Sequence, residues 1–571
     1  MGGRWRQTGV GLTRQRARCD SDPALATNET QPDGPTAEVA APGAPDGAAA
    51  PEAAPSASSG DGGAQDAEVA RKAGRGGLAV AFAKMYFILH GLIQQIALPR
   101  VLGLDGYGAL SSVLSIASVT YNPVVTTSIQ GVSRAVAQSA DEDQPAAIRR
   151  TLKIHTTLTI PLAVAFFLLA GPIGRWIGAP HVVGALRIIS GVMLFYGVYT
   201  PLVGVVNGQK RFHFQAGFDI LFATVRTGGL IAGGWWFATR YGQGVEGSTW
   251  GFVAASLAIL VVALAVVGVG KAGSGGPTVR QHLTFIAPLL LGQTLLNLLL
   301  QADLTLLRRF ASDAAVATGL DVTAADPLVG AYRATQLFCF LPYQMLIAVT
   351  FIIFPLLATA YRDGDRDAVA RYVRTGVRLA LVLAGAMVSV TSGLSGPLLL
   401  LVFPPEAAEL GTRAMQLLTL GFGAFGIFGI LTTVLNSLKR ERASAAITTV
   451  AFSLVVVLCF VRVRGGPFGE ELLWRTAVAT SLGIALATVG AALLVKRTTG
   501  AVVAPLSLVR VLGAMAVAIA VARYLPYAGK IATIGYSAAI GLLYFVLLIV
   551  MREVGKADLA TIKTVLSRRR S

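Results

Sequence analysis

The sequence predicts an all-α integral membrane protein with about fourteen transmembrane helices. Hydrophobic residues make up 54% of its 571 positions and charged residues only 14%, whereas roughly a quarter of the residues of a soluble protein are charged. The apolar residues occur in blocks of about twenty or more, the length of helix that crosses the hydrocarbon core of a bilayer. The blocks also lack the two-residue alternation of outer-membrane barrel strands. Because a helix bonds its own backbone groups without water, a bundle of spanning helices accounts for all three observations.

The first 74 residues differ in composition from the rest and are predicted to form a disordered tail. Residues 21–70 contain no aromatic residue, Ile, Lys or Arg, and consist mainly of Ala, Pro, Gly and acidic residues. Such a stretch cannot bury enough apolar surface to offset the entropy of ordering it. Residues 1–20 are rich in Arg but have no apolar core, so they do not resemble a secretory signal.

The predicted spans follow one another with short connections, the longest of which is expected at 308–328. The first six are 78–98, 108–137, 153–174, 183–206, 214–237 and 249–269. The next six are 283–307, 329–357, 373–402, 413–436, 444–463 and 472–495. A last pair lies at 507–525 and 531–551.

Internal repetition predicts that the first twelve helices form two related lobes. A turn Ala170-Gly171-Pro172 after the third span is matched by Ser395-Gly396-Pro397 after the ninth, about 225 positions later. The end of the fourth span, Asn207–Arg211, is matched by Asn436–Arg440, about 229 positions later. An offset of six helices gives parallel repeats around a central cavity.

The repeats set the expected domain limits. An N-lobe is expected at 75–270 and a C-lobe at 271–497, followed at 498–571 by two further helices and a basic tail.

Basic residues orient the chain in the membrane. With the N-terminus in the cytoplasm, about 26 Lys and Arg residues lie in the inner loops and tails, against about 12 on the other side. Such a bias over short loops predicts that both termini are cytoplasmic. The formal charge of +18 is explained in this way, so no nucleic-acid partner is expected.

Enzymatic motifs are not found. The sequence has no P-loop, HExxH or G-x-S-x-G in the required context, and Cys19, Cys339 and Cys459 are too scattered for a disulfide framework. The outer loops are short and Asp105 is a lone acid in one of them, which disfavours a membrane glycosyltransferase, polymerase or ligase. We expect a protein that is not an enzyme and needs no cofactor or metal.

Three short motifs resemble the polysaccharide flippases of the multidrug/oligosaccharidyl-lipid/polysaccharide exporter superfamily. Leu98–Gly108 resembles the connection between that family's first two helices, R-x-L-G-x-x-x-[FY]-G. Gly330–Ala334 is similar to the opening of helix eight, and Asn207–Arg211 to the end of helix four. The similarity in layout covers roughly residues 75–500, and the last two helices match the fourteen-helix branch.

The resemblance implies a flippase that moves undecaprenyl-diphosphate-linked oligosaccharide, a cell-surface polysaccharide precursor, across the bacterial inner membrane by alternating access. It further implies membrane lipids, and the polysaccharide polymerase and export machinery, as partners. A lipid II flippase and a cation-coupled multidrug exporter share the fold and stay open as alternatives.

Charged residues inside predicted spans are the main candidates for cargo binding, because a charge at mid-bilayer normally faces the protein interior or a wet cavity. Arg226 lies near the middle of the fifth span and Lys84 a third of the way into the first. An Arg fork and a Lys point charge both suit a lipid diphosphate. Arg333, near the outer end of the eighth span, is a further candidate.

Amide side chains are expected to contact the glycan. Gln95 follows Lys84 by eleven residues and therefore returns to nearly the same helix face. Gln293, Asn297 and Gln301 are spaced by four along the seventh span and form a stripe. The alternative is structural: the bases pair with Asp219 or Asp303, and the amides join helices.

Overall fold

A computed structural model describes residues 63–273 and 275–555 of the chain. The chain divides into two units, Met1–Val39 and Ala40–Ser571, and everything below concerns the second. Residues 1–62 of the predicted disordered tail and residues 556–571 of the predicted basic tail lie outside the described residues. Within the described residues the all-α prediction is confirmed, since fifteen α-helices, two short 3-10 helices and no strand are found there.

The first helices are α1 (Gly63–Ala137), α2 (Gln144–Trp176), η1 (Pro180–Val182), α3 (Val183–Gly208), α4 (Phe212–Tyr241), α5 (Gly244–Val267) and α6 (Val279–Ala317). There follow η2 (Val322–Ala324), α7 (Ala325–Cys339), α8 (Leu341–Arg362), α9 (Arg366–Gly393), α10 (Ser395–Val402) and α11 (Pro405–Ser437). The last are α12 (Glu441–Arg462), α13 (Glu470–Thr499), α14 (Pro505–Arg523) and α15 (Lys530–Val550).

Every predicted span falls on a helix. Eleven of the helices in the described part are long and apolar enough to cross a membrane. The first two predicted spans lie on α1, the eighth is divided between α7 and α8, and the ninth between α9 and α10. The chain is therefore a multi-pass membrane protein.

The kink in α1 is built on Gly103. Its φ of 75° and ψ of 173° are not helical, and the positive φ is one that glycine adopts without strain. Gln95 and Tyr107, twelve residues apart, would be separated by about 18 Å along a straight helix. The Tyr107 hydroxyl instead donates to Gln95 Oε1 at 2.5 Å, so the chain folds back at Gly103 into two antiparallel helices.

Two long predicted spans are interrupted where proline follows. α7 ends at Cys339, and Pro342 lies in the first turn of α8. α9 ends at Gly393, and Pro397 lies in the first turn of α10. Proline has no N–H to continue the helical ladder, and its ring clashes with the preceding turn.

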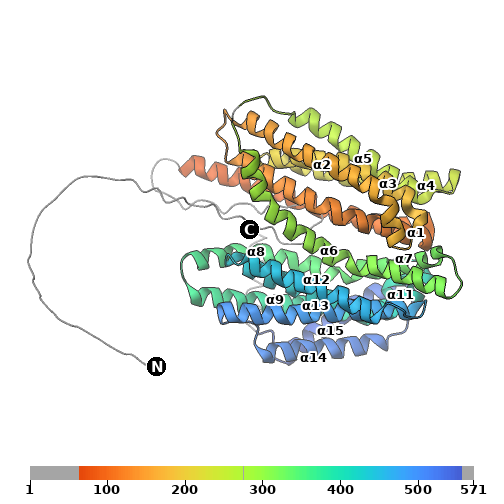
Figure 1. The fold of residues 1–571 in the computed structure, drawn as a ribbon. Helices are drawn as coiled ribbons and strands as arrows, with labels where there is room; N and C mark the ends of the chain where they lie inside the picture. Colours follow the sequence, from red (N-terminus) through yellow and green to blue (C-terminus); the bar gives the residue numbers. More distant parts are fainter. Residues whose placement is uncertain (1–62, 274, 556–571) are drawn as a thin grey trace, which may run out of the picture. The chain divides into compact units, whose positions relative to one another are not determined.

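The two predicted repeats have the same pattern of helix contacts. In the first, α3 packs on α1, α2 and α5, and α4 packs on α5. In the second, α11 packs on α7, α8, α9 and α13, and α12 packs on α13. Figure 1 shows α1–α5 and α7–α15 as two bundles, with α6 crossing between them.

One repeated landmark is confirmed in backbone detail. Two residues beyond the last residue of α3 and of α11 lies a lysine at positive φ, 57° at Lys210 and 55° at Lys439. The next amide closes the turn in each case, Arg211 N to Val206 O at 2.8 Å and Arg440 N to Leu435 O at 2.9 Å.

Three expectations from the sequence are corrected. Ala170-Gly171-Pro172 is not a turn, because α2 continues through it to Trp176. The expected long connection at 308–328 is mostly helical: α6 runs to Ala317, and an i,i+4 ion pair joins Arg309 and Asp313 at 3.1 Å. α1 already begins at Gly63, because Gln65–Lys72 contains several good helix formers.

The helix ends near Gly103, Gly178 and Asp326 are called the kink end below. The ends near Asp143 and Gly276 are called the opposite end.

Glycines bring α4 and α5 unusually close. A Cβ atom on Gly251 would lie 1.8 Å from the Gly229 carbonyl oxygen, and one on Gly233 would lie 2.3 Å from that of Gly247. Small residues at such contacts let two membrane helices pack backbone to backbone.

Gly251→Ala is therefore expected to force α4 and α5 apart and to destabilise the protein by about 1–3 kcal/mol, as overpacking does. The matched control is Gly228→Ala, where a Cβ atom meets nothing within 4 Å. Thermal unfolding in detergent should show a lower midpoint for Gly251→Ala alone. Equal midpoints would mean that this contact does not limit stability.

Candidate functional site

The structure places Lys84 and Asp219 together on the face shared by α1 and α4. Lys84 Nζ lies 3.0 Å from Asp219 Oδ2, and the two side chains are 19% and 10% exposed. A charge within a membrane span needs such a partner. Pairing with Asp219 was the structural alternative for Lys84, and its charge is balanced in this conformation.

Arg226 lies on the same face and is held differently. Its Cζ atom is 4.9 Å from the centre of the Phe252 ring and 5.8 Å from that of Phe87. Among the described residues, Arg226 Nε is buried without a hydrogen-bond partner, and no carboxylate lies within 4 Å of the guanidinium. Cation–π contacts with the two rings hold the guanidinium in place.

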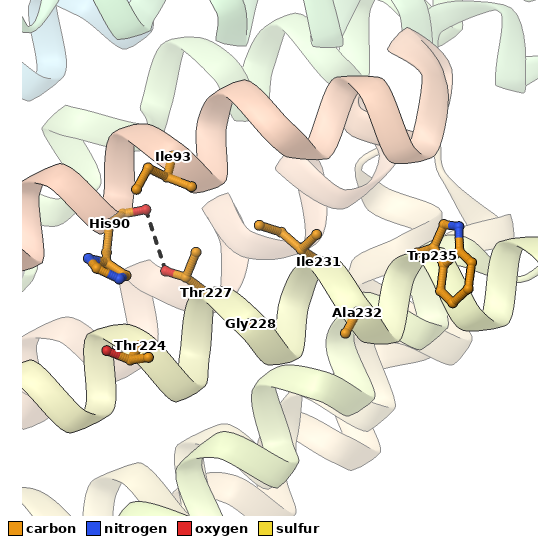
Figure 2. A pocket seen from close by; sticks show the side chains of 8 residues that line it. All are labelled: His90, Ile93, Thr224, Thr227, Gly228, Ile231, Ala232 and Trp235. Atoms are coloured by element: carbon orange, nitrogen blue, oxygen red, sulfur yellow. Dashed lines mark hydrogen bonds between the residues drawn. The ribbon is translucent and has the colours of Figure 1, made fainter.

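A groove of about 510 Å³ runs between α1 and α4 (Figure 2). It is lined by His90, Ile93, Thr224, Thr227, Gly228, Ile231, Ala232 and Trp235. The Thr227 hydroxyl donates to the His90 carbonyl at 3.4 Å, and the Tyr86 and Thr224 hydroxyls lie 2.9 Å apart. The groove is mostly apolar and contains none of the seven residues predicted to bind cargo.

The predicted amide stripe of α6 faces the second half of α1. Asn122 Nδ2 donates to Asn297 Oδ1 at 3.1 Å, and the Ser115 hydroxyl donates to Gln301 Oε1 at 3.0 Å. Asn297 also donates to the Gln293 carbonyl at 2.9 Å. Asn297 and Gln301 therefore join two helices in this conformation, whereas Gln293 contributes only its backbone to these bonds.

Two other predicted residues lie towards the kink end. Gln95 accepts from Tyr107 across the fold at Gly103. Arg333 donates to Gln336 Oε1 at 3.0 Å, and Gln336 in turn donates to the buried Asp303 at 3.1 Å. The structure thus brings Lys84 and Arg226 to one face but places Arg333 in a separate buried network.

Sequence analysis missed a buried ion cluster at the kink end. Arg308 NH1 lies 2.9 Å from Asp326 Oδ1, and His181 Nε2 lies 2.9 Å from Asp326 Oδ2. Arg308 also donates to the Gly178 carbonyl at 3.3 Å, as does Ser312 at 2.8 Å. The cluster ties the α2–α3 connection to α6 and α7. It was missed because 308–328 was predicted to be an exposed loop.

The kink end is closed by backbone contacts as well. A Cβ atom on Gly108 would lie 1.9 Å from the Asp326 carbonyl oxygen, and one on Gly330 would lie 2.3 Å from that of Leu104. Arg100 donates to the Val402 carbonyl at 2.7 Å. The turn of α1 is therefore packed against α7 and the end of α10.

A pair of histidines was also missed. His155 on α2 and His282 on α6 bring their Nε2 atoms within 2.9 Å, and both are buried. The two residues are 127 positions apart, and no periodicity in the sequence connects them.

Comparison with known proteins agrees with this architecture. Residues 73–360, about half of the chain, match the family model described as polysaccharide biosynthesis protein. Residues 288–461 match the MatE model. No curated protein matches the chain significantly in sequence.

Three solved structures illustrate the shared fold. The lipid II flippase MurJ, in an inward closed conformation, aligns at TM-score 0.65 and 13% identity, covering 83% of this chain and 99% of that one. An inward-facing multidrug resistance MATE family transporter aligns at TM-score 0.58 and 14% identity, covering 72% and 94%. A mutant of the Vibrio cholerae MATE transporter VcmN aligns at TM-score 0.51 and 14% identity, covering 76% and 97%. At these identities the likeness is one of fold.

Asp326→Asn should weaken the closure of the kink end, because it leaves Arg308 buried without a counter-charge. Removing one partner of a buried ion pair costs about 3–5 kcal/mol. The control is Asp313→Asn, which breaks the half-exposed pair with Arg309, where a loss of at most about 1 kcal/mol is expected. Unfolding midpoints and amide hydrogen exchange over 175–182 test this, and equal effects of the two substitutions would contradict it.

Proposed function

We propose that this chain, which belongs to the polysaccharide biosynthesis protein family of the multidrug/oligosaccharidyl-lipid/polysaccharide exporter superfamily, flips an undecaprenyl-diphosphate-linked oligosaccharide across the bacterial inner membrane. Membership of that superfamily makes the chain a membrane transporter or flippase. The proposal concerns its cargo, a cell-surface polysaccharide precursor, and its mode of action, which is alternating access between the two bundles.

The state of Arg226 carries the proposal. A half-buried guanidinium in the predicted fifth span, with an unbonded Nε and no carboxylate of the described residues within 4 Å, attracts an anion strongly because little solvent screens it. Its planar fork matches phosphate oxygens. A lipid diphosphate supplies such an anion at bilayer depth.

The apolar groove supports a cargo that is part lipid. Its lining residues are largely apolar. An isoprenoid chain could therefore lie in this groove, which most α4 lining residues place on another side of the helix from Arg226. An oligosaccharide without a lipid carrier has no comparable use for these apolar walls.

The seven predicted residues take different parts in this proposal. Arg226 contacts the diphosphate, and the side-chain amide of Gln293 contacts the glycan. Lys84 is balanced by Asp219 and acts on the cargo only if that pair opens. Gln95, Asn297, Gln301 and Arg333 bond other side chains in this conformation, and they become available to the glycan as the helices separate.

The predicted orientation of the chain in the membrane indicates which step of the transport cycle this conformation represents. If both termini are cytoplasmic, the kink end faces the far side of the membrane. The closed kink end then keeps cargo from the far side of the membrane in this conformation, and the lobes rock to open the kink end later in the cycle.

The lipid II flippase is the nearest alternative, supported by the likeness in fold to MurJ. Lipid II also carries a diphosphate, so Arg226 does not separate the two cargoes. An exporter of organic cations is less well supported, because such a site favours an unpaired acid and Asp219 is paired with Lys84.

We expect Arg226→Ala to abolish flipping while leaving the protein in the membrane at normal levels, and Arg226→Lys to restore part of the activity by restoring the charge. The measurement is the amount of sugar-linked lipid on each face of the inner membrane, in cells depleted of the wild-type protein. Loss of surface polysaccharide should accompany accumulation on the cytoplasmic face.

The control is the double substitution Lys84→Met with Asp219→Leu, which removes an ion pair without leaving a buried charge. It should retain flipping if the pair is structural. Accumulation of lipid II instead of another sugar-lipid would select the alternative flippase. Unchanged sugar-lipids together with altered sensitivity to cationic drugs would select the exporter.

A further inference from the structure

Three helices meet around the buried pair of histidines. His155 and His282 are each 3% exposed, and their rings are perpendicular, with centroids 5.1 Å apart. The Ser128 hydroxyl of α1 lies 3.0 Å from His155 Nδ1. Gly131 leaves room for the His282 ring, because a Cβ atom there would lie 3.3 Å from its Cε1.

The contact between the two Nε2 atoms limits how many protons the pair of rings can bind. An Nε2–Nε2 distance of 2.9 Å is a hydrogen bond only when one nitrogen carries its proton and the other is bare. Both tautomeric arrangements satisfy this, since Ser128 can donate to or accept from His155 Nδ1. Two neutral imidazoles therefore share a single N–H in the contact.

One further proton can bind the bare Nδ1 of the donating imidazole and leaves the Nε2–H···Nε2 contact intact. A second further proton binds the remaining bare Nε2, so that two N–H groups face each other, the pair carries two positive charges and the contact breaks. The neighbouring charged groups are basic: Arg134 on α1, Arg150 and Lys153 on α2, and Arg280 on α6. On α3, which also packs on α2, residues 188–208 carry no charge, and their titratable groups are Tyr196 and Tyr199. The acid Asp143 is twelve residues from His155, about 18 Å along α2.

The histidine pair lies where the start of α6 is attached to α2. His282 lies in the first turn of α6, the helix that crosses between the bundles. The segment before it is docked on α2, with Lys271 N bonded to the Pro145 carbonyl at 3.0 Å and Arg150 to the Gly276 carbonyl at 3.3 Å. Breaking the contact between the rings loosens the opposite end of α6 from α2.

We propose that His155 and His282 form a proton-binding site that couples proton uptake to the separation of α6 from α2. The state with the rings in contact binds at most one additional proton and the separated state binds two, so acidification favours separation. By linkage, the equilibrium shifts by up to about tenfold per pH unit for each additional proton bound. A pH gradient across the membrane can thereby bias the transport cycle, whatever the cargo is.

Amide hydrogen exchange of the full chain in lipid nanodiscs tests this between pH 8 and pH 5, after correction for the intrinsic pH dependence of exchange. Protection over 276–290 and 148–158 should fall at least tenfold in the wild-type protein on acidification. In the double variant His155→Gln with His282→Gln, which keeps hydrogen-bonding side chains but cannot take up the proton, protection over these segments should be independent of pH.

His213→Gln is the matched control, since His213 is exposed at the start of α4 and its loss should leave the wild-type pH dependence intact. Protection that does not change with pH in the wild-type protein overturns the proposal, and this outcome needs no variant to fold. A pH dependence that persists in the double variant overturns it as well. Neither result depends on which cargo the protein carries.

Discussion

Hydrocarbon can neither hydrogen-bond a backbone amide nor solvate a charge, and most features of this structure follow from that constraint. The backbone is satisfied within helices, and several charged and polar side chains inside them pair with neighbouring helices. Lys84 is balanced by Asp219, Arg308 by Asp326, and Asp303 accepts hydrogen bonds from Tyr332 and Gln336. Arg226 differs from Lys84 and Arg308 because, among the described residues, no carboxylate lies within 4 Å of its guanidinium. This difference is the reason an anionic ligand is proposed for it.

The constraint also explains how much of the fold can be predicted from the sequence. Helix positions depend on local apolar composition, so each expected span falls on a helix. The repeat of Asn207–Arg211 at Asn436–Arg440 is a local turn and is reproduced in backbone detail. Errors arose where local signals conflict. Gly171-Pro172 suggests a turn, but α2 continues through both residues to Trp176. The polar residues after 308 suggest a loop, but their charges are paired.

The candidate site was less predictable, because its geometry depends on contacts between distant parts of the chain. Arg226 could be singled out as a charge in the middle of a span, since that property is local. Gln95 was assigned to the face of Lys84 from helical periodicity, but the fold at Gly103 gives it Tyr107 as a partner. The partners of Asn297 and His282 lie well over one hundred positions away. Only the packing of α6 against α1 and α2 brings them into register.

That packing gives α6 two different attachments to the first bundle. At the kink end, Arg308 and Ser312 bond the Gly178 carbonyl, and the ion pair of Arg308 with Asp326 is buried. At the opposite end the attachment is a pair of neutral imidazoles, about 39 Å away along the helix axis. An arginine keeps its charge at any physiological pH, whereas an imidazole changes protonation within that range. At the kink end α6 is therefore attached through the permanent charge of Arg308, and at the opposite end through a titratable contact. Under the proposed proton site, protonation releases the opposite end of α6 while its attachment through Arg308 is kept.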